Sequence, residues 1–224
     1  MPGEEVGLLS ERTSERVTGV SGALFVIGAV VGFGVLVGSV PGPGAEGGEV
    51  RDFLARSEAR VWTGGYLGLL AVLAFLVFAG GLWNLLRTAE GGTGWISTVG
   101  LAAATANVAV TVSADLVPGA AVFREGTRVD AEVASILLEG KHFAEMVTVP
   151  LIGLFLASAA LVSLRTGALP RWAGWSAALV AAASVLGVPL GYETSQIPVF
   201  LAALWILAVS VRLLARPSGF AAAA

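Results

Sequence analysis

Long stretches without a single charged residue constrain the fold of this chain more than any other feature. They are residues 17–45, 61–86, 91–114, 146–164, 172–192 and 194–211. About 20 apolar residues in an α-helix cover the roughly 30 Å hydrocarbon core of a bilayer, because each residue adds about 1.5 Å. Strands of a membrane barrel alternate polar and apolar residues, and these stretches do not. The sequence therefore predicts an all-α integral membrane protein, a bundle of six transmembrane helices.

Composition supports this class and excludes several kinds of chemistry. Hydrophobic residues make up 56% of the chain and charged residues only 13%, against roughly 25% charged in soluble domains. The net charge of −3 offers no basic surface for nucleic acid, so no nucleic-acid partner is expected. Cysteine is absent, which excludes disulfides and thiolate ligands.

Metal and cofactor sites are not expected either. The chain has one histidine, His142, so a cluster of histidine ligands cannot form within it. Glu139 and His142 match one Glu-x-x-His motif of di-iron bundles, but such sites need two copies and further glutamates. We therefore predict no metal and no cofactor.

The chain divides into a polar amino-terminal tail (1–16), a single six-span domain (17–215) and a carboxyl-terminal tail (216–224). The first apolar stretch is too long for a signal peptide, and acidic residues precede it, so we expect an uncleaved first span. Pro118 and Gly119 are expected to end the third span. The sequence between 187 and 193, rich in proline and glycine, divides the last apolar region into spans 5 and 6.

The two long connections are each expected to hold a short amphipathic helix. In the first, residues 51–60 are charged and lead into span 2. In the second, Val129, Val133, Ile136 and Leu137 recur at helical spacing. This spacing predicts a helix over 129–138 that lies on the membrane, with Val133 and Ile136 buried and span 4 beginning separately at His142.

Glycines of the first span form two small-xxx-small pairs, Gly28 with Gly32 and Gly34 with Gly38. Such pairs let a neighbouring helix approach closely. We expect this neighbour to be another helix of the bundle, and a homo-oligomer through the four glycines is the alternative partner interaction besides the lipid bilayer.

A turn near the start of span 5 carries a family resemblance. Residues 167–175 read Gly-Ala-Leu-Pro-Arg-Trp-Ala-Gly-Trp, and His142 follows the second long connection. In both features the chain resembles the bacterial membrane family called domain of unknown function 4386, over roughly residues 17–215. The resemblance implies the six-span topology and no activity.

The short turns indicate the orientation. Arg87, Arg165 and Arg171 flank the 2–3 and 4–5 turns, whereas the 5–6 turn has no arginine or lysine. Because short cytoplasmic loops carry an excess of positive charge, we predict a multi-pass protein of the bacterial inner (plasma) membrane with both termini in the cytoplasm.

Ionisable side chains near the outer span ends are the candidate site. Asp115 lies near the end of span 3, and His142 and Glu145 lie near the start of span 4, three residues apart on one helical face. Antiparallel packing of these spans would bring the three to similar depth. Charged groups at membrane depth are costly and are functional candidates by default.

Four further residues are candidate ligand contacts: Tyr66, Asn107, Tyr192 and Glu193. The competing interpretation is that the polar residues are interfacial, with Lys141 paired to Glu145 at i, i+4. Asn107 has a second interpretation too, as a helix-to-helix hydrogen bond.

Three functions from different classes remain open. The leading hypothesis is an outer-facing pocket that binds a small lipophilic or amphipathic molecule. The first alternative is an intramembrane acid–base enzyme, of the cyclase or isomerase type, in which Asp115, His142 and Glu145 act on a lipophilic substrate. The second alternative is a structural or partner-binding subunit.

Overall fold

The computed structural model of the chain describes residues 2–37, 40–56, 58–123 and 130–215, and this part is almost entirely helical. Its elements are α1 (Pro2–Ala29), the π-helix η1 (Val30–Val37), α2 (Gly47–Arg56), α3 (Glu58–Glu90), α4 (Trp95–Phe123), α5 (Ala131–Thr166), α6 (Arg171–Gly187), the 3-10 helix η3 (Val188–Leu190) and α7 (Tyr192–Ala215). Six of them, α1, α3, α4, α5, α6 and α7, are long and apolar enough to cross a membrane. The six-helix bundle is therefore confirmed.

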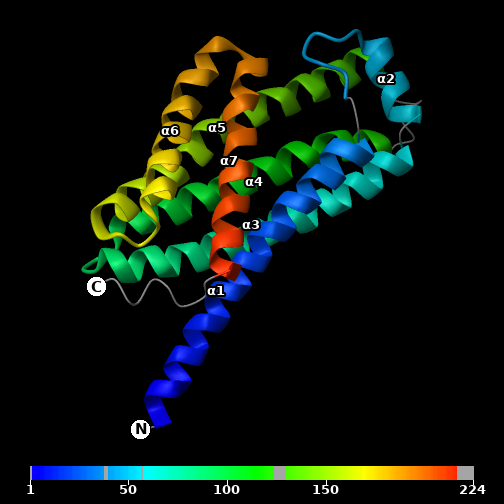
Figure 1. The fold of residues 1–224 in the computed structure, drawn as a ribbon. Helices are drawn as coiled ribbons and strands as arrows, with labels where there is room; N and C mark the ends of the chain where they lie inside the picture. The colour runs from blue at the N-terminus through cyan, green and yellow to red at the C-terminus, as the bar shows by residue number, and fades with distance from the viewer. Residues whose placement is uncertain (1, 38–39, 57, 124–129, 216–224) are drawn as a thin grey trace.

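The six long helices pack as a closed ring. Each contacts the next in the chain, ignoring α2, and α7 returns to pack against α1. Figure 1 shows the α3–α4 turn, the α5–α6 turn and the carboxyl end of α7 at one end of the bundle. The helix α2 and the α6–α7 connection lie at the other end. We call these two ends the turn end and the α2 end.

Aromatic side chains form the centre of the bundle. The Phe75 ring on α3 lies 5.0 Å from Phe25 of α1 and 5.7 Å from Phe155 of α5, between ring centroids. Phe155 in turn meets the Trp205 ring of α7 edge-on at 6.4 Å. The Trp205 indole N–H donates to the Ala173 carbonyl of α6 at 2.9 Å. This chain of contacts joins five helices through large rings whose edge-to-face packing is favourable.

Glycines allow the helices to approach closely around this core. A Cβ on Gly28 would lie 2.9 Å from the Ala71 Cβ of α3, and one on Gly32 would lie 2.8 Å from the Gly64 carbonyl oxygen. These two glycines thus pack against α3 within the same chain. A Cβ on Gly34 would meet nothing within 4 Å, and Gly38 lies outside the described residues. The oligomer through these glycines stays a prediction.

Two predicted boundaries are wrong. The helix α4 continues through Pro118 to Phe123, because a proline inside an apolar helix can bend it without ending it. The predicted helix at 129–138 is not a separate element, since α5 runs without a break from Ala131 to Thr166, with Asp130 as its amino-terminal cap. A helix has no reason to end where the apolar pattern changes unless proline, glycine or a cap interrupts it.

The amino-terminal part of α5 packs against α2 through a face that the sequence did not indicate. Ala134 and Leu138 are buried there with Val50 of α2, whereas Val133 and Ile136 are 48% and 63% exposed. Their burial, predicted from the same spacing, does not occur within the protein. The first connection holds α2 at Gly47–Arg56, and α3 begins at Glu58. The predicted helix over 51–60 covers parts of both, and residue 57 between them lies outside the described residues.

The break before the last span follows the prediction. The helix α6 ends at Gly187, the short η3 contains Pro189, and Gly191 has a φ of 103° that favours glycine. Pro198 lies inside α7 and does not end it. This connection brings Tyr192, the first residue of α7, to the α2 end.

Candidate functional site

A lysine at the α2 end bridges two of the predicted carboxylates. Lys141 Nζ lies 3.3 Å from Asp115 Oδ1 of α4, and it also pairs with Glu145 Oε1 one turn further along α5. The Lys141 side chain is only 14% exposed. The expected i, i+4 pair is therefore present, but Lys141 also crosses to the neighbouring helix and is central to the group.

Tyr192 adds a third helix to the cluster. Its hydroxyl donates to Glu145 Oε2 at 2.5 Å, while the other oxygen of this carboxylate faces Lys141. The sequence suggested Tyr192 as a candidate ligand contact, and the structure places it in direct contact with a carboxylate. We call Asp115, Lys141, His142, Glu145 and Tyr192 the α2-end cluster.

His142 is the least satisfied member of the α2-end cluster. It is buried, 6% exposed, and its ring lies 4.9 Å from the Tyr192 ring, between centroids, at a tilt of 59°. Its Nδ1 is buried and has no hydrogen-bond partner among the described residues. A buried polar atom without a partner costs free energy, so it indicates either a ligand position or a compromise in packing.

Local helix geometry explains why these side chains meet. Lys141 and Glu145 are four residues apart and share one face of α5. His142 is rotated by about 100° from Lys141 on the helix, which turns it from α4 toward α7. Asp115 lies on α4, which packs closely against α5, and the Asn107 amide joins the same two helices by donating to the Thr148 carbonyl at 3.0 Å.

The other predicted contact residues lie outside the α2-end cluster. Tyr66 is 62% exposed on the outer surface of α3, and Glu193 is exposed in the first turn of α7. Asn107 is engaged by α5, as the alternative interpretation expected. The depth of a residue along its helix, which the sequence indicates, could not show which of these side chains face the cluster. That depends on how each helix is rotated about its axis.

The bonding of the cluster limits its chemistry. Glu145 accepts from Tyr192 and pairs with Lys141, and Asp115 also pairs with Lys141. Within the part of the chain that the structure describes, no three His, Asp or Glu side chains are arranged to hold a metal ion. The geometry resembles an interhelical ionic cluster, in which His142 Nδ1 is the buried polar atom without a partner among the described residues.

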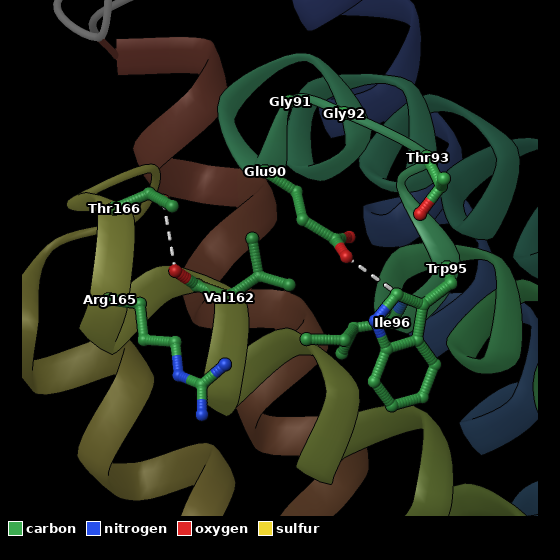
Figure 2. Close-up of a pocket in the computed structure, with 9 residues that line it drawn as sticks. All are labelled: Glu90, Gly91, Gly92, Thr93, Trp95, Ile96, Val162, Arg165 and Thr166. Atoms are coloured by element: carbon green, nitrogen blue, oxygen red, sulfur yellow. Dashed lines mark hydrogen bonds between the residues drawn. The ribbon is translucent and has the colours of Figure 1, made fainter.

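A cavity lies at the opposite end of the bundle, where the sequence had suggested no site. It has a volume of about 400 Å³, within the range of roughly 300–1,000 Å³ typical of small-molecule sites. We call it the turn pocket, and Figure 2 shows its lining by the α3–α4 turn on one side and the end of α5 on the other. The residues that line it are Glu90, Gly91, Gly92, Thr93, Trp95, Ile96, Val162, Arg165 and Thr166.

Glycines at positive φ shape the two turns beside this pocket. Gly91 and Gly92 have φ values of 67° and 54°, and Gly167, which ends α5, has a φ of 76°. These are conformations that glycine adopts without strain. The sequence contained the signal in the Gly-Gly-Thr-Gly turn and the flanking arginines, but it could not show that the two turns lie side by side.

No protein-family model matches the chain, and neither a curated protein nor a solved structure is significantly similar to it. The resemblance to domain of unknown function 4386 therefore stays a prediction from its motif. The residues of this motif have structural roles in the fold. Gly167 caps α5, Pro170 is the residue before α6, and a Cβ on Gly174 would lie 2.8 Å from Leu164 Cδ2.

Proposed function

We propose that the chain is a multi-pass protein of the bacterial inner membrane, with the turn end in the cytoplasm. The supporting observation is the outer surface of the bundle, on which large apolar side chains are exposed along α1, α3, α5, α6 and α7. Examples are Leu24 on α1 (56% exposed), Leu73 on α3 (48%), Leu179 on α6 (70%) and Phe200 on α7 (64%). Soluble monomers rarely expose contiguous apolar areas beyond a few hundred Å².

The tryptophans on α3 have the spacing of a bilayer. Trp62 and Trp83 lie near opposite ends of this helix, and 21 residues at about 1.5 Å each separate them by roughly 32 Å. This equals the hydrocarbon thickness of a typical membrane, about 30 Å. Trp95, Trp172 and Trp175 are exposed at the turn end, as expected for an aromatic belt at the membrane–water interface.

For the activity of this protein, the function that the geometry supports best is binding of a small lipophilic or amphipathic molecule at the α2 end. The observation that carries this proposal is the buried His142 Nδ1 without a partner, next to the Tyr192 ring. A neutral imidazole nitrogen accepts or donates one hydrogen bond, so a ligand hydroxyl, carbonyl or amide would satisfy it. The apolar surface around the helices would admit the ligand from the bilayer.

The geometry supports acid–base catalysis less well than ligand binding. A general base has to lie within hydrogen-bond reach of the proton that it takes, and the two carboxylates of the cluster already face Lys141 and Tyr192. The enzyme alternative would need Lys141 to release one of them. Ligand binding at His142 would leave the contacts of both carboxylates with Lys141 and Tyr192 in place.

Co-purification tests the binding proposal. The chain is purified in mild detergent, and bound lipophilic molecules are extracted and identified by mass spectrometry, for the native protein and for His142→Phe. Phenylalanine keeps the ring next to Tyr192 and removes both nitrogens. We expect a compound that is retained by the native protein and lost from His142→Phe.

Glu193→Gln is the matched control, because Glu193 is exposed at the same end and lies outside the α2-end cluster. It should retain the compound. Identical extracts from the native protein and from a folded His142→Phe variant would contradict the proposal.

A further inference from the structure

The turn pocket holds a carboxylate whose position is fixed. Glu90 Oε1 accepts from the Ile96 N–H at 3.0 Å, and Oε2 accepts from the Ser97 N–H at 2.9 Å and from the Ser97 hydroxyl at 2.5 Å. A carboxylate offers about four acceptor positions. Three are used to cap the start of α4, so one position remains for a donor inside the pocket.

Arg165 supplies the opposite charge. It lines the pocket from the last turn of α5 and is exposed. Among the described residues it has no hydrogen bond or ion pair, and its charge acts on Glu90 from beyond pairing distance. Figure 2 shows the two charged groups on either side of Val162. Arginine binds phosphate through two parallel N–H bonds, which a single ammonium cannot offer.

Apolar side chains form part of the lining of the turn pocket, which lies at the level of the tryptophans. Val162 is 1% exposed and forms the floor, and Trp95 is 64% exposed at the rim. Gly91 and Gly92 add no side chains to the rim, and a Cβ at either would meet nothing within 4 Å. An exposed tryptophan of a membrane helix lies at the headgroup level of the lipid.

From these features we propose that the turn pocket binds the headgroup of a phospholipid that joins a phosphate to a primary ammonium, as in phosphatidylethanolamine. The phosphate would pair with Arg165, the ammonium would donate to the free position on Glu90, and the glycerol and first acyl carbons would lie against Trp95. The pocket lies at the opposite end of the bundle from the α2-end cluster. This inference rests on the proposed membrane location and is independent of the ligand proposed there.

The charge pair implies an order of lipid preference. A phosphatidylcholine headgroup keeps the positive charge but has no N–H to donate to Glu90. A phosphatidylglycerol headgroup can donate a hydroxyl to Glu90, but it has no cation to offset the Glu90 charge. Retention should therefore be highest for phosphatidylethanolamine, the one headgroup of the three that offers both a cation and an N–H donor.

Native mass spectrometry of the full chain in detergent, titrated with each of these three lipids, tests the proposal. Arg165→Gln should lower retention of phosphatidylethanolamine by about tenfold, the loss expected for one charge-assisted contact. Glu90→Gln should abolish the preference for phosphatidylethanolamine over phosphatidylglycerol. Arg171→Gln is the matched control, because Arg171 is an exposed arginine at the same end that does not line the pocket, and it should leave both lipids unchanged.

Three results would overturn the proposal: equal retention of phosphatidylethanolamine and phosphatidylglycerol by the native chain, equal losses in Arg165→Gln and Arg171→Gln, or displacement of the lipid by an equal concentration of soluble glycerophosphoethanolamine. The last result would show that acyl chains contribute nothing. Because Glu90 also caps α4, the Glu90→Gln variant is checked by thermal unfolding, and if it does not fold, Arg165→Gln and the three lipids decide the question.

Discussion

Substituting Gly32 by alanine should destabilise the bundle, and the same substitution at Gly34 should not. A Cβ on Gly32 would lie 2.8 Å from the Gly64 carbonyl oxygen and 3.0 Å from the Gly68 nitrogen. Both contacts are with backbone atoms of α3, which cannot rotate away as a flexible side chain would. A Cβ on Gly34, in the same π-helix η1, would meet nothing within 4 Å.

The size of the effect follows from two opposing contributions. Overpacking at a helix contact costs about 1–3 kcal/mol, and replacing glycine by alanine in a helix gains about 0.5–1 kcal/mol. The gain applies to both variants, so it cancels when they are compared. Gly32→Ala should therefore be less stable than Gly34→Ala by about 1–3 kcal/mol, which corresponds to a Tm lower by roughly 2–12 °C for a chain of this length.

Thermal unfolding of the detergent-solubilised chain, followed by circular dichroism, measures this difference. Size-exclusion chromatography of the same samples tests the alternative use of these glycines in a homo-oligomer. Equal Tm values for the two variants would refute the close contact between η1 and α3. A change of oligomeric state in Gly32→Ala with an unaltered Tm would instead show that Gly32 contacts a second copy of the chain.

Three shorter predictions concern the cluster, the core and the topology. Lys141→Met should lower the free energy of unfolding by about 1–3 kcal/mol, because two partly buried carboxylates lose their cation, and adding Asp115→Asn should recover part of the loss. Trp205→Phe should cost about 1 kcal/mol through the lost bond to Ala173, and Trp175→Phe, on an exposed ring, should cost less; equal Tm values for the two would contradict this. Reporter fusions after Gly92 and after Thr166 should both report the cytoplasm, and a periplasmic result at either would contradict the proposed orientation.

The six long helices were predictable because a long stretch of apolar residues without charges indicates the length of an apolar helix. The break at Gly187 and Pro189 was predictable as well, since two breakers close together end a helix where a single Pro118 or Pro150 does not. The continuous α5 was not predictable from periodicity. The apolar pattern of α5 changes where its neighbour changes from α2 to the other long helices, but its backbone remains helical across that point.

The sequence predicted at which depth of the bundle the candidate site lies, but not how each helix is rotated about its axis. Their positions along the chain indicated that Asp115 and Glu145 lie at a similar depth along the bundle, because consecutive helices are antiparallel. Which faces meet depends on packing, so sequence could not indicate that Lys141 bridges the two carboxylates or that Tyr66 faces outward. The turn pocket was unpredictable for a related reason, since it requires the turn after Glu90 and the turn after Thr166, far apart in the sequence, to lie side by side.

The partners of each group at the α2 end determine how its function can be studied. Lys141 holds α4 and α5 together, and Tyr192 connects α7 to Glu145 of α5, so substituting either one changes a contact between two helices. Loss of a function in such a variant would not distinguish a ligand contact from a structural one. His142 differs because its Nδ1 holds no other described residue in place. Its ring can be replaced by another aromatic ring while the ionic contacts stay intact, so the imidazole is the position at which binding and stability can be measured separately.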